Sequence, residues 1–271
     1  MIRIAVIALA GMGGLYLVLL LLIYSFQRNL MYFPDQAVSS DAVLSAAGFE
    51  RISIDSDDFE PLVSLWQPPS APEKPVILHF HGNAGSVFHR IPLYQQMAAD
   101  GAGVLAVGYP GYGGNGGEIS EGNFHQTARA NYDWLIEHGI EPKRIIIAGQ
   151  SIGSGSATRL AAEKDAAGMI LEAPFTGTDD IAARQFPYFP VRLLMKDSFR
   201  NVDLIAGIDM PLVWIHGTAD EVISFEIGQL LFDRAEQPKT AFPIKNGGHN
   251  DLWDRGIGKI IRDEAARLSR E

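Results

Sequence analysis

From Arg51 onwards the chain alternates short β-branched runs with helical patterns, and this alternation restricts the fold more than any other feature. Strands that alternate with helices pair in parallel, and the helices cover both faces of the sheet. We therefore expect an α/β protein with a mostly parallel central sheet. The first two strands follow each other without a helix between them, which predicts an antiparallel lead-in at one edge. The expected strands span residues 51–54, 61–66, 76–81, 103–107, 144–148, 169–173, 212–216 and 240–244, and the expected helices span 89–100, 124–138, 152–163, 226–235 and 251–268.

The first residues differ in kind from the rest, because no charged side chain occurs from Ile4 to Tyr24. About twenty apolar residues at 1.5 Å per residue cover the roughly 30 Å hydrocarbon core of a bilayer. A cleaved signal peptide is the alternative, since residues 8–10 read Ala-Leu-Ala, but the longest leucine run comes after that point. We expect residues 1–35 to form a membrane anchor with a juxtamembrane segment, and residues 36–271 to form the globular domain. Arg3 and the α-amine before the span, against Arg28 after it, favour a globular domain outside the cytoplasm.

Composition excludes several classes of function. The formal net charge of −10 argues against a nucleic-acid partner, because phosphate binding depends on Lys and Arg. The absence of cysteine excludes disulfides, thiolate metal sites and cysteine nucleophiles. His79 and His81 alternate on one strand, but no further metal ligands follow them, so we expect no metal site.

The most specific local signal is the sequence Gly-Gln-Ser-Ile-Gly at residues 149–153, which follows an apolar strand and opens a helical stretch. A nucleophile elbow needs small residues two before and two after the serine, so that the chain can turn sharply and lift the hydroxyl clear of the sheet. The bare pattern could be a glycine-rich turn without chemistry, but the strand before it and the helix after it are the context that the motif requires. Ser151 is therefore the predicted nucleophile.

A serine nucleophile needs a histidine base and an acid that orients the base. His249 lies in a loop between the last predicted strand and the last helix, and Asp220 lies on the loop that leaves the strand at 212–216. The chain order Ser151, Asp220, His249 is the order that accompanies this elbow. Glu221 and Asp251 are the rivals for the acid.

A glycine-rich loop, His-Gly-Asn-Ala-Gly at residues 81–85, ends another predicted strand. Backbone N–H groups at such a strand end can stabilise an oxyanion. We expect the amides of Asn83 and Ile152 to form this oxyanion hole.

The alternation breaks between residues 175 and 209, where prolines and aromatic residues gather. An excursion at this point would lie over the carboxyl ends of the strands. It is the candidate lid or cap.

Several stretches together resemble the α/β-hydrolase superfamily over about residues 51–268, and within it the single-pass group related to the bud-emergence (Bem) proteins and the membrane-anchored abhydrolase-domain proteins. The stretches that carry the resemblance are QRNLMYFPD, LHFHGNAGS, GYPGYGGNGGEISEGNF, IIIAGQSIGSGSA, IHGTADEVI and GGHNDL. The chain departs from many relatives at Pro110, where they have Arg, and at Gln126, where Asp is common. The resemblance implies the α/β-hydrolase fold, with Ser151 as nucleophile, Asp220 as acid, His249 as base, and Asn83 and Ile152 as oxyanion amides.

The expected activity is hydrolysis of a carboxylic ester or thioester through an acyl-enzyme, without a metal or organic cofactor. The aromatic cap and the membrane anchor favour a small-molecule substrate with an acyl chain. Two alternatives stay open: a peptidase or acyltransferase on the same triad, and a membrane-tethered binding protein without turnover.

Overall fold

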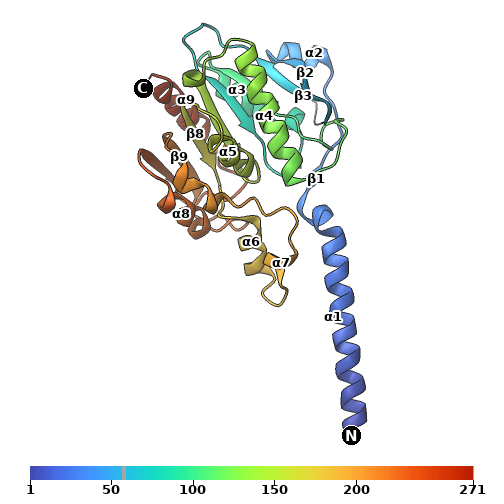
Figure 1. The fold of residues 1–271 in the computed structure, drawn as a ribbon. Helices are drawn as coiled ribbons and strands as arrows, with labels where there is room; N and C mark the ends of the chain where they lie inside the picture. The colour runs from blue at the N-terminus through green and yellow to red at the C-terminus, as the bar shows by residue number, and fades with distance from the viewer. Residues whose placement is uncertain (57–58, 271) are drawn as a thin grey trace.

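A computed structural model of the chain describes residues 1–56 and 59–270, and shows one α/β body from which a long N-terminal helix projects (Figure 1). The strands are β1 (Phe33–Pro34), β2 (Glu50–Ser56), β3 (Phe59–Gln67), β4 (Val76–Phe80), β5 (Ala84–Gly85), β6 (Gly103–Ala106), β7 (Ile145–Gln150), β8 (Gly168–Glu172), β9 (Leu212–Gly217) and β10 (Lys239–Ile244). The α-helices are α1 (Ile2–Met31), α2 (Asp41–Ala46), α3 (Ile91–Ala98), α4 (Glu121–Glu137), α5 (Gly153–Ala161), α6 (Thr178–Gln185), α7 (Val191–Leu194), α8 (Phe225–Arg234) and α9 (Ile257–Leu268).

Within the described residues, eight strands form the central sheet in the order β10-β9-β8-β7-β4-β6-β3-β2. The six strands from β10 to β6 pair in parallel, whereas β3 pairs antiparallel with both β6 and β2. This confirms the predicted parallel sheet with an antiparallel lead-in at one edge. Pro243 lies in β10, an edge strand, where a residue that cannot donate to a ladder is tolerated.

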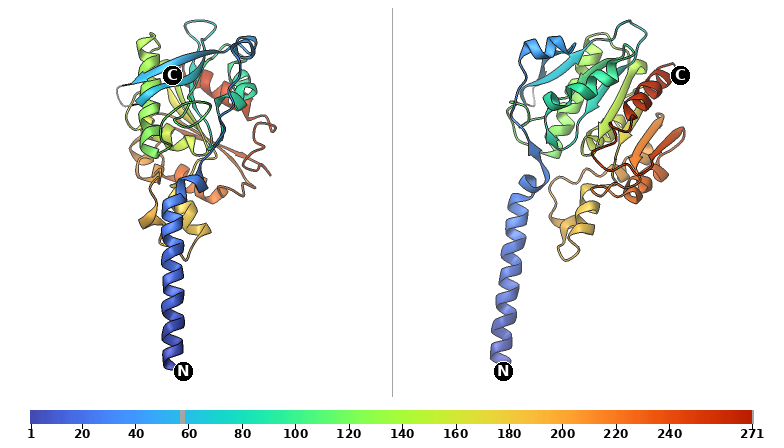
Figure 2. Two further views of the ribbon diagram at one scale, coloured as in Figure 1. Left: turned by 90° about the vertical axis from the view of Figure 1, so that its right-hand side faces the viewer. Right: turned by 180° about the vertical axis from the view of Figure 1, so that it is seen from behind.

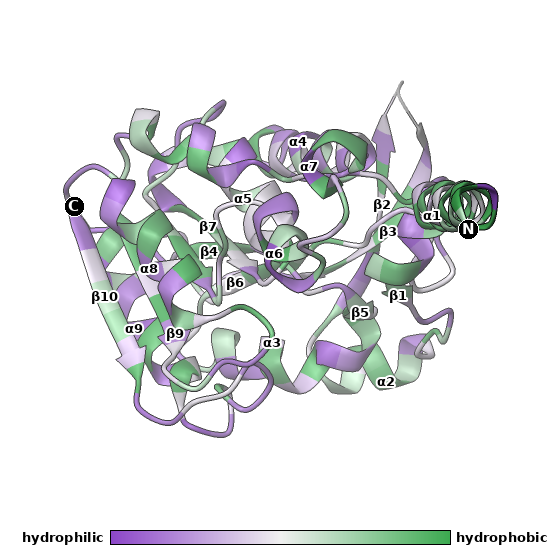
Figure 3. Ribbon diagram, turned by 90° about the horizontal axis from the view of Figure 1, so that it is seen from below, coloured by the Kyte–Doolittle hydropathy of each residue, from purple (hydrophilic) through white to green (hydrophobic). Residues whose placement is uncertain are grey.

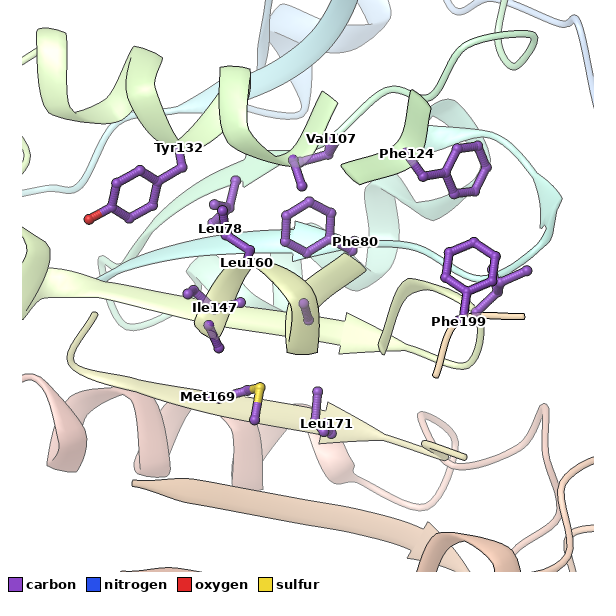
Figure 4. Close-up of a cluster of buried hydrophobic side chains, with 14 of the residues drawn as sticks. Leu78, Phe80, Val107, Phe124, Tyr132, Ile147, Leu160, Met169, Leu171 and Phe199 are labelled. Atoms are coloured by element: carbon purple, nitrogen blue, oxygen red, sulfur yellow. The ribbon is translucent and has the colours of Figure 1, made fainter. Parts of the chain in front are cut away.

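Two hydrophobic cores sandwich the sheet, because the buried parallel strands are apolar on both faces. On one face Phe124 of α4 and Leu160 of α5 pack over Leu78 and Ile147 (Figure 4). On the other face α3 and α9 contact each other and cover the strands. Layers of this kind put the loops at the carboxyl ends of the parallel strands on one side of the body.

The predicted start of the last helix needs correction. The helix expected from residue 251 begins at Ile257, because Asp251 accepts a hydrogen bond from the amide of Gly248 at 2.7 Å and Gly256 adopts a left-handed conformation with φ of 86°. The segment 175–209 was expected only as an excursion, and it contains the short helices α6 and α7. Both lie on the side of the body from which α1 leaves (Figures 1 and 2).

Helix α1 is long and apolar enough to cross a membrane, and most of its ribbon has the colour of hydrophobic residues when the helix is viewed end-on (Figure 3). Its last turn is fixed to the body. The guanidinium of Arg28 donates to the buried Asp197 at 2.7 and 3.0 Å and pairs with Glu118. Directly after the helix, β1 pairs in parallel with β5, so the chain that leaves α1 is bonded to the glycine-rich loop that follows β4.

Substitution of two neighbouring leucines on α8 tests the packing of the core. Leu231 is fully buried, whereas Leu230 is 50% exposed. In the full-length protein in detergent, Leu231→Ala should lower the free energy of unfolding by about 2–5 kcal/mol, since it leaves a cavity. Leu230→Ala, the matched control, should change it by no more than about 0.5 kcal/mol. Urea titration followed by tryptophan fluorescence measures both, and equal losses would contradict the packing described for α8.

Candidate active site

Ser151 occupies a tight turn between β7 and α5. Its φ of 51° lies in the left-handed region, which is unusual for a residue other than glycine. The turn is possible because the chain packs very closely on both sides of the serine. A Cβ atom at Gly149 would lie 2.6 Å from the carbonyl oxygen of Gly153, and one at Gly153 would lie 2.2 Å from that of Phe80. The glycines of the Gly-x-Ser-x-Gly motif are therefore required by close backbone approach.

The structure brings the three predicted side chains together. Nδ1 of His249 lies 2.8 Å from Oδ2 of Asp220, and Nε2 of His249 lies 3.1 Å from Oγ of Ser151. The serine follows β7, the aspartate follows β9 and the histidine follows β10. Three neighbouring or next-neighbouring strand ends thus supply a continuous chain of hydrogen bonds.

The loops that carry Asp220 and His249 are joined by their backbones. The amide of Ala219 donates to the carbonyl of Gly247 at 2.8 Å, and the amide of Asn246 donates to the hydroxyl of Thr218 at 2.9 Å. These bonds hold carboxylate and imidazole in register, although the two residues are 29 positions apart.

Asp220 is buried, and both of its carboxylate oxygens have partners. Its Oδ1 accepts from the amides of Val222 at 2.9 Å and Ile223 at 2.8 Å, while His216 approaches Oδ2 at 3.4 Å. Burial by itself raises the pKa of Asp220, but the hydrogen bonds with His216 and His249 outweigh it and hold that pKa well below its usual range. A carboxylate at this position accepts from Nδ1–H, which leaves the lone pair of Nε2 facing Ser151.

The rivals for the acid lie elsewhere. Asp251 accepts from the amide of Gly248 and forms an ion pair with Arg255, and Glu221 is exposed. The sequence did not single out His216 as a partner of Asp220, although its position at the end of β9 places it there.

The amides of Asn83 and Ile152 donate no hydrogen bond to any described residue, and both residues line the pocket that reaches Ser151. Asn83 is fixed through its other groups. Its side-chain amide donates to the carbonyl of Met31 at 2.8 Å, and its own carbonyl accepts from Phe33 and Tyr112. Two unpaired N–H groups beside one hydroxyl can receive a developing negative charge.

The pocket has a volume of about 410 Å³ and is mainly apolar. Ser151 is among its lining residues, the segment of α6 and α7 forms one wall, and the second half of α1 forms another. The sequence did not predict that α1 would line the pocket.

A buried carboxylate next to the elbow was also missed. Glu172 ends β8, and its two carboxyl oxygens accept from Gln150 at 2.9 Å and from Trp253 at 3.0 Å. Its backbone carbonyl accepts from the amide of Ser151 at 2.8 Å. Glu172 therefore joins the serine turn to the chain just after His249. Burial raises the pKa of Glu172 to about 7, although the two donors lower it in part.

Among the described residues no group of His, Cys, Asp and Glu is arranged to hold a metal ion. His79 and His81 are buried, and the ring of His81 packs against Tyr109. Burial lowers the pKa of His79 to about 3, so its ring is neutral at physiological pH.

Glu172 generates a pH prediction. Between about pH 4.5 and 7 an unfolded glutamate is ionised while the folded Glu172 keeps its proton, so stability is lost as the pH rises through this window. Glu172→Gln removes this ionisation, and Gln150 can rotate its amide to pair with the new side chain. Between pH 5 and pH 8 the unfolding free energy of the variant should rise relative to wild type by on the order of 2 kcal/mol. Glu137→Gln, at an exposed glutamate, is the control, and a parallel pH dependence of Glu172→Gln and wild type would contradict the prediction.

Comparisons with known proteins agree with this fold. The family described as serine aminopeptidase S33 (Hydrolase_4) matches residues 71–204. An uncharacterized Mycobacterium tuberculosis protein, Rv2307c, is 31% identical over 99% of this chain and 94% of its own length. Alpha/beta hydrolase domain-containing protein 17B of Xenopus laevis is 36% identical over 68% of this chain and 62% of its own length.

Solved structures show the same architecture. The Pyrococcus furiosus esterase Pf2001 superposes with a TM-score of 0.66 at 19% identity, covering 89% of this chain and 96% of that one. Est1E of Butyrivibrio proteoclasticus, solved with ferulic acid bound, superposes with a TM-score of 0.68 at 17% identity, covering 81% of this chain and 100% of that one. The sequence relatives and the shared fold together show that this chain is a hydrolase of the α/β-hydrolase superfamily.

Proposed function

We propose that the protein is a serine hydrolase that cleaves a carboxylic ester or thioester with an acyl chain. The observation that supports this most directly is the hydrogen-bond chain from Asp220 through His249 to Ser151, which ends in an apolar pocket. A hydroxyl in this arrangement is activated by an adjacent base, and the base is oriented by a third group.

In the first step Oγ of Ser151 attacks the substrate's carbonyl carbon while Nε2 of His249 takes the hydroxyl proton. The amides of Asn83 and Ile152 stabilise the oxyanion, and the positive end of α5 adds to this stabilisation. Collapse of the intermediate breaks the bond to the leaving oxygen or sulfur, which takes the proton from His249. Water, deprotonated by His249, then attacks the acyl-enzyme, and the acid product leaves as Ser151 regains its proton.

The pocket favours an ester substrate over a peptide with a free N-terminal ammonium group. An aminopeptidase needs an anionic group to bind the substrate's ammonium, and none of the described residues that line this pocket is Asp or Glu. The family description names a serine aminopeptidase, and one solved structure of similar fold is a puromycin-hydrolyzing peptidase of Mycobacterium tuberculosis. The acyl-ester substrate is supported here by the lining of this chain's own pocket.

We further propose that α1 is an uncleaved membrane anchor, with the catalytic domain outside the cytoplasm, and that the segment 175–209 is the cap of the active site. The contacts of Arg28 with the buried Asp197 support retention of the helix, and the position of α6 and α7 over Ser151 supports the cap.

Labelling by a fluorophosphonate tests the nucleophile. Wild type should label, and Ser151→Ala should lose all labelling because the only activated hydroxyl of the proposal is gone. Ser154→Ala is the matched control, since Ser154 is three residues away and its hydroxyl has no hydrogen-bond partner among the described residues. Equal labelling of Ser151→Ala and wild type would refute the assignment.

Substitution of the acid tests the orientation of the base. Asp220→Asn should lower kcat for a soluble ester by roughly ten-thousandfold, because the amide cannot hold the imidazole in the required tautomer. Asp251→Asn, at the rival carboxylate, should keep the wild-type rate. If Asp251→Asn lost more activity than Asp220→Asn, the acid would be misassigned.

A further inference from the structure

One face of α1 is part of the substrate pocket. The partly buried residues of its second half that line the pocket, Leu20, Ile23, Gln27 and Met31, recur every three or four positions and so lie on one stripe of the helix. The remaining surface of that half is mostly exposed. A helix that served only as a tether would not need a stripe that faces the active site.

The cap lies along this stripe over a considerable length. The hydroxyl of Tyr16 donates to the carbonyl of Tyr188 at 2.8 Å, and the Tyr16 ring stacks on Phe189 with 5.7 Å between centroids. Nearer the body, Gln27 bonds the backbone of Leu194 and Lys196. The cap therefore contacts α1 from Tyr16 to Arg28.

These contacts place the tip of the cap at membrane depth. Tyr16 lies eight residues before Tyr24, where the continuous apolar run ends, and eight residues span about 12 Å along the helix axis. The ammonium of Lys196 lies 4.4 Å from the ring centre of Tyr24, a cation and an aromatic ring suited to the lipid headgroup region. With α1 across a bilayer, residues 188 and 189 reach the hydrocarbon.

The tip has the chemistry that immersion in lipid requires. Phe186, Tyr188 and Leu193 are 51%, 86% and 83% exposed, which is unusual for large apolar side chains in water. Backbone polar groups in lipid must be satisfied internally, and the carbonyl of Tyr188 is bonded by Tyr16. Further amides of the cap donate to cap carbonyls, namely those of Phe186, Phe189, Val191, Leu193, Leu194 and Met195, and the prolines 187 and 190 have no N–H. The amide of Tyr188 has no partner among the described residues.

We propose that α1 and the cap form the two walls of a channel that opens into the bilayer, and that the acyl chain of a substrate held in the same leaflet enters through it to reach Ser151. The proposal rests on the ester hydrolase function proposed above and adds its substrate class, a long-chain acyl ester or thioester resident in the membrane. Ile23 lines the pocket on the α1 wall, and Ile181 lines it on the cap wall. The interior is apolar, so an acyl chain that moves from lipid into it stays in an apolar environment.

Tryptophan variants on both walls test the channel in full-length enzyme reconstituted in phosphatidylcholine vesicles. For Ile23→Trp and for Ile181→Trp, the ratio of kcat/KM for p-nitrophenyl palmitate to that for p-nitrophenyl butyrate should fall about tenfold or more, since even one misfitting methylene has effects of that size. Leu22→Trp, whose side chain is 47% exposed on another face of α1, should keep the wild-type ratio. An unchanged ratio in both wall variants would overturn the channel. Failure of wild type to hydrolyse either ester would instead refute the proposed function.

The source of the substrate is tested with a fluorogenic long-chain ester that carries a second alkyl chain, which keeps it in its vesicle. The enzyme should hydrolyse this ester in its own vesicle at least about tenfold faster than in separate vesicles, because entry is lateral within one leaflet. Equal rates in the two arrangements would show that the chain arrives through water, and would overturn the bilayer route.

Discussion

The close packing of α5 on β7 and β4 determines the position of Ser151, on which the rest of the site depends. At Gly149 and Gly153 the backbones approach to a distance that no Cβ atom would permit. This contact forces the chain to turn at once after β7, and the left-handed conformation of Ser151 follows from it. The strain of a single non-glycine residue in this region is of order 1–3 kcal/mol, and the two packed cores on either side of the sheet hold it in place. The close packing at the two glycines fixes the turn, and the turn places Ser151 in the lining of the pocket.

Two buried carboxyl groups near the serine turn, Asp220 and Glu172, differ in their hydrogen-bond donors. Asp220 receives two amides and two imidazoles, so it stays ionised even though its side chain is fully buried. Glu172 receives only the side-chain N–H groups of Gln150 and Trp253, and burial raises its pKa to about 7. The pKa values of these two buried carboxyl groups are thus shifted in opposite directions, because the number and kind of their hydrogen-bond donors differ.

Much of this architecture could be predicted from the sequence. Apart from the edge strand β10, the parallel strands are buried and mostly apolar, and the observed bounds of all six lie within two residues of those expected. Ser151, Asp220 and His249 each follow a parallel strand, so their convergence follows from the parallel topology. Their catalytic roles, the cap and the orientation in the membrane stay predictions. The parts that were missed depend on tertiary contact. Helices α6 and α7 are short and lie in a proline-rich segment braced by α1, and the partners of Glu172 come from distant parts of the chain.

The bond between the side chain of Asn83 and the carbonyl of Met31 gives the N-terminal helix a second role. Together with the pairing of β1 and β5, it makes the end of α1 a support for the loop that carries Asn83, which lines the pocket with Ser151. If α1 is the membrane anchor proposed above, proteolysis in the first thirty residues would release the body from the lipid and also free one side of this loop. The shed domain would then hold the proposed oxyanion donor Asn83 less rigidly, so the proposed anchor would couple membrane attachment to the support of the site.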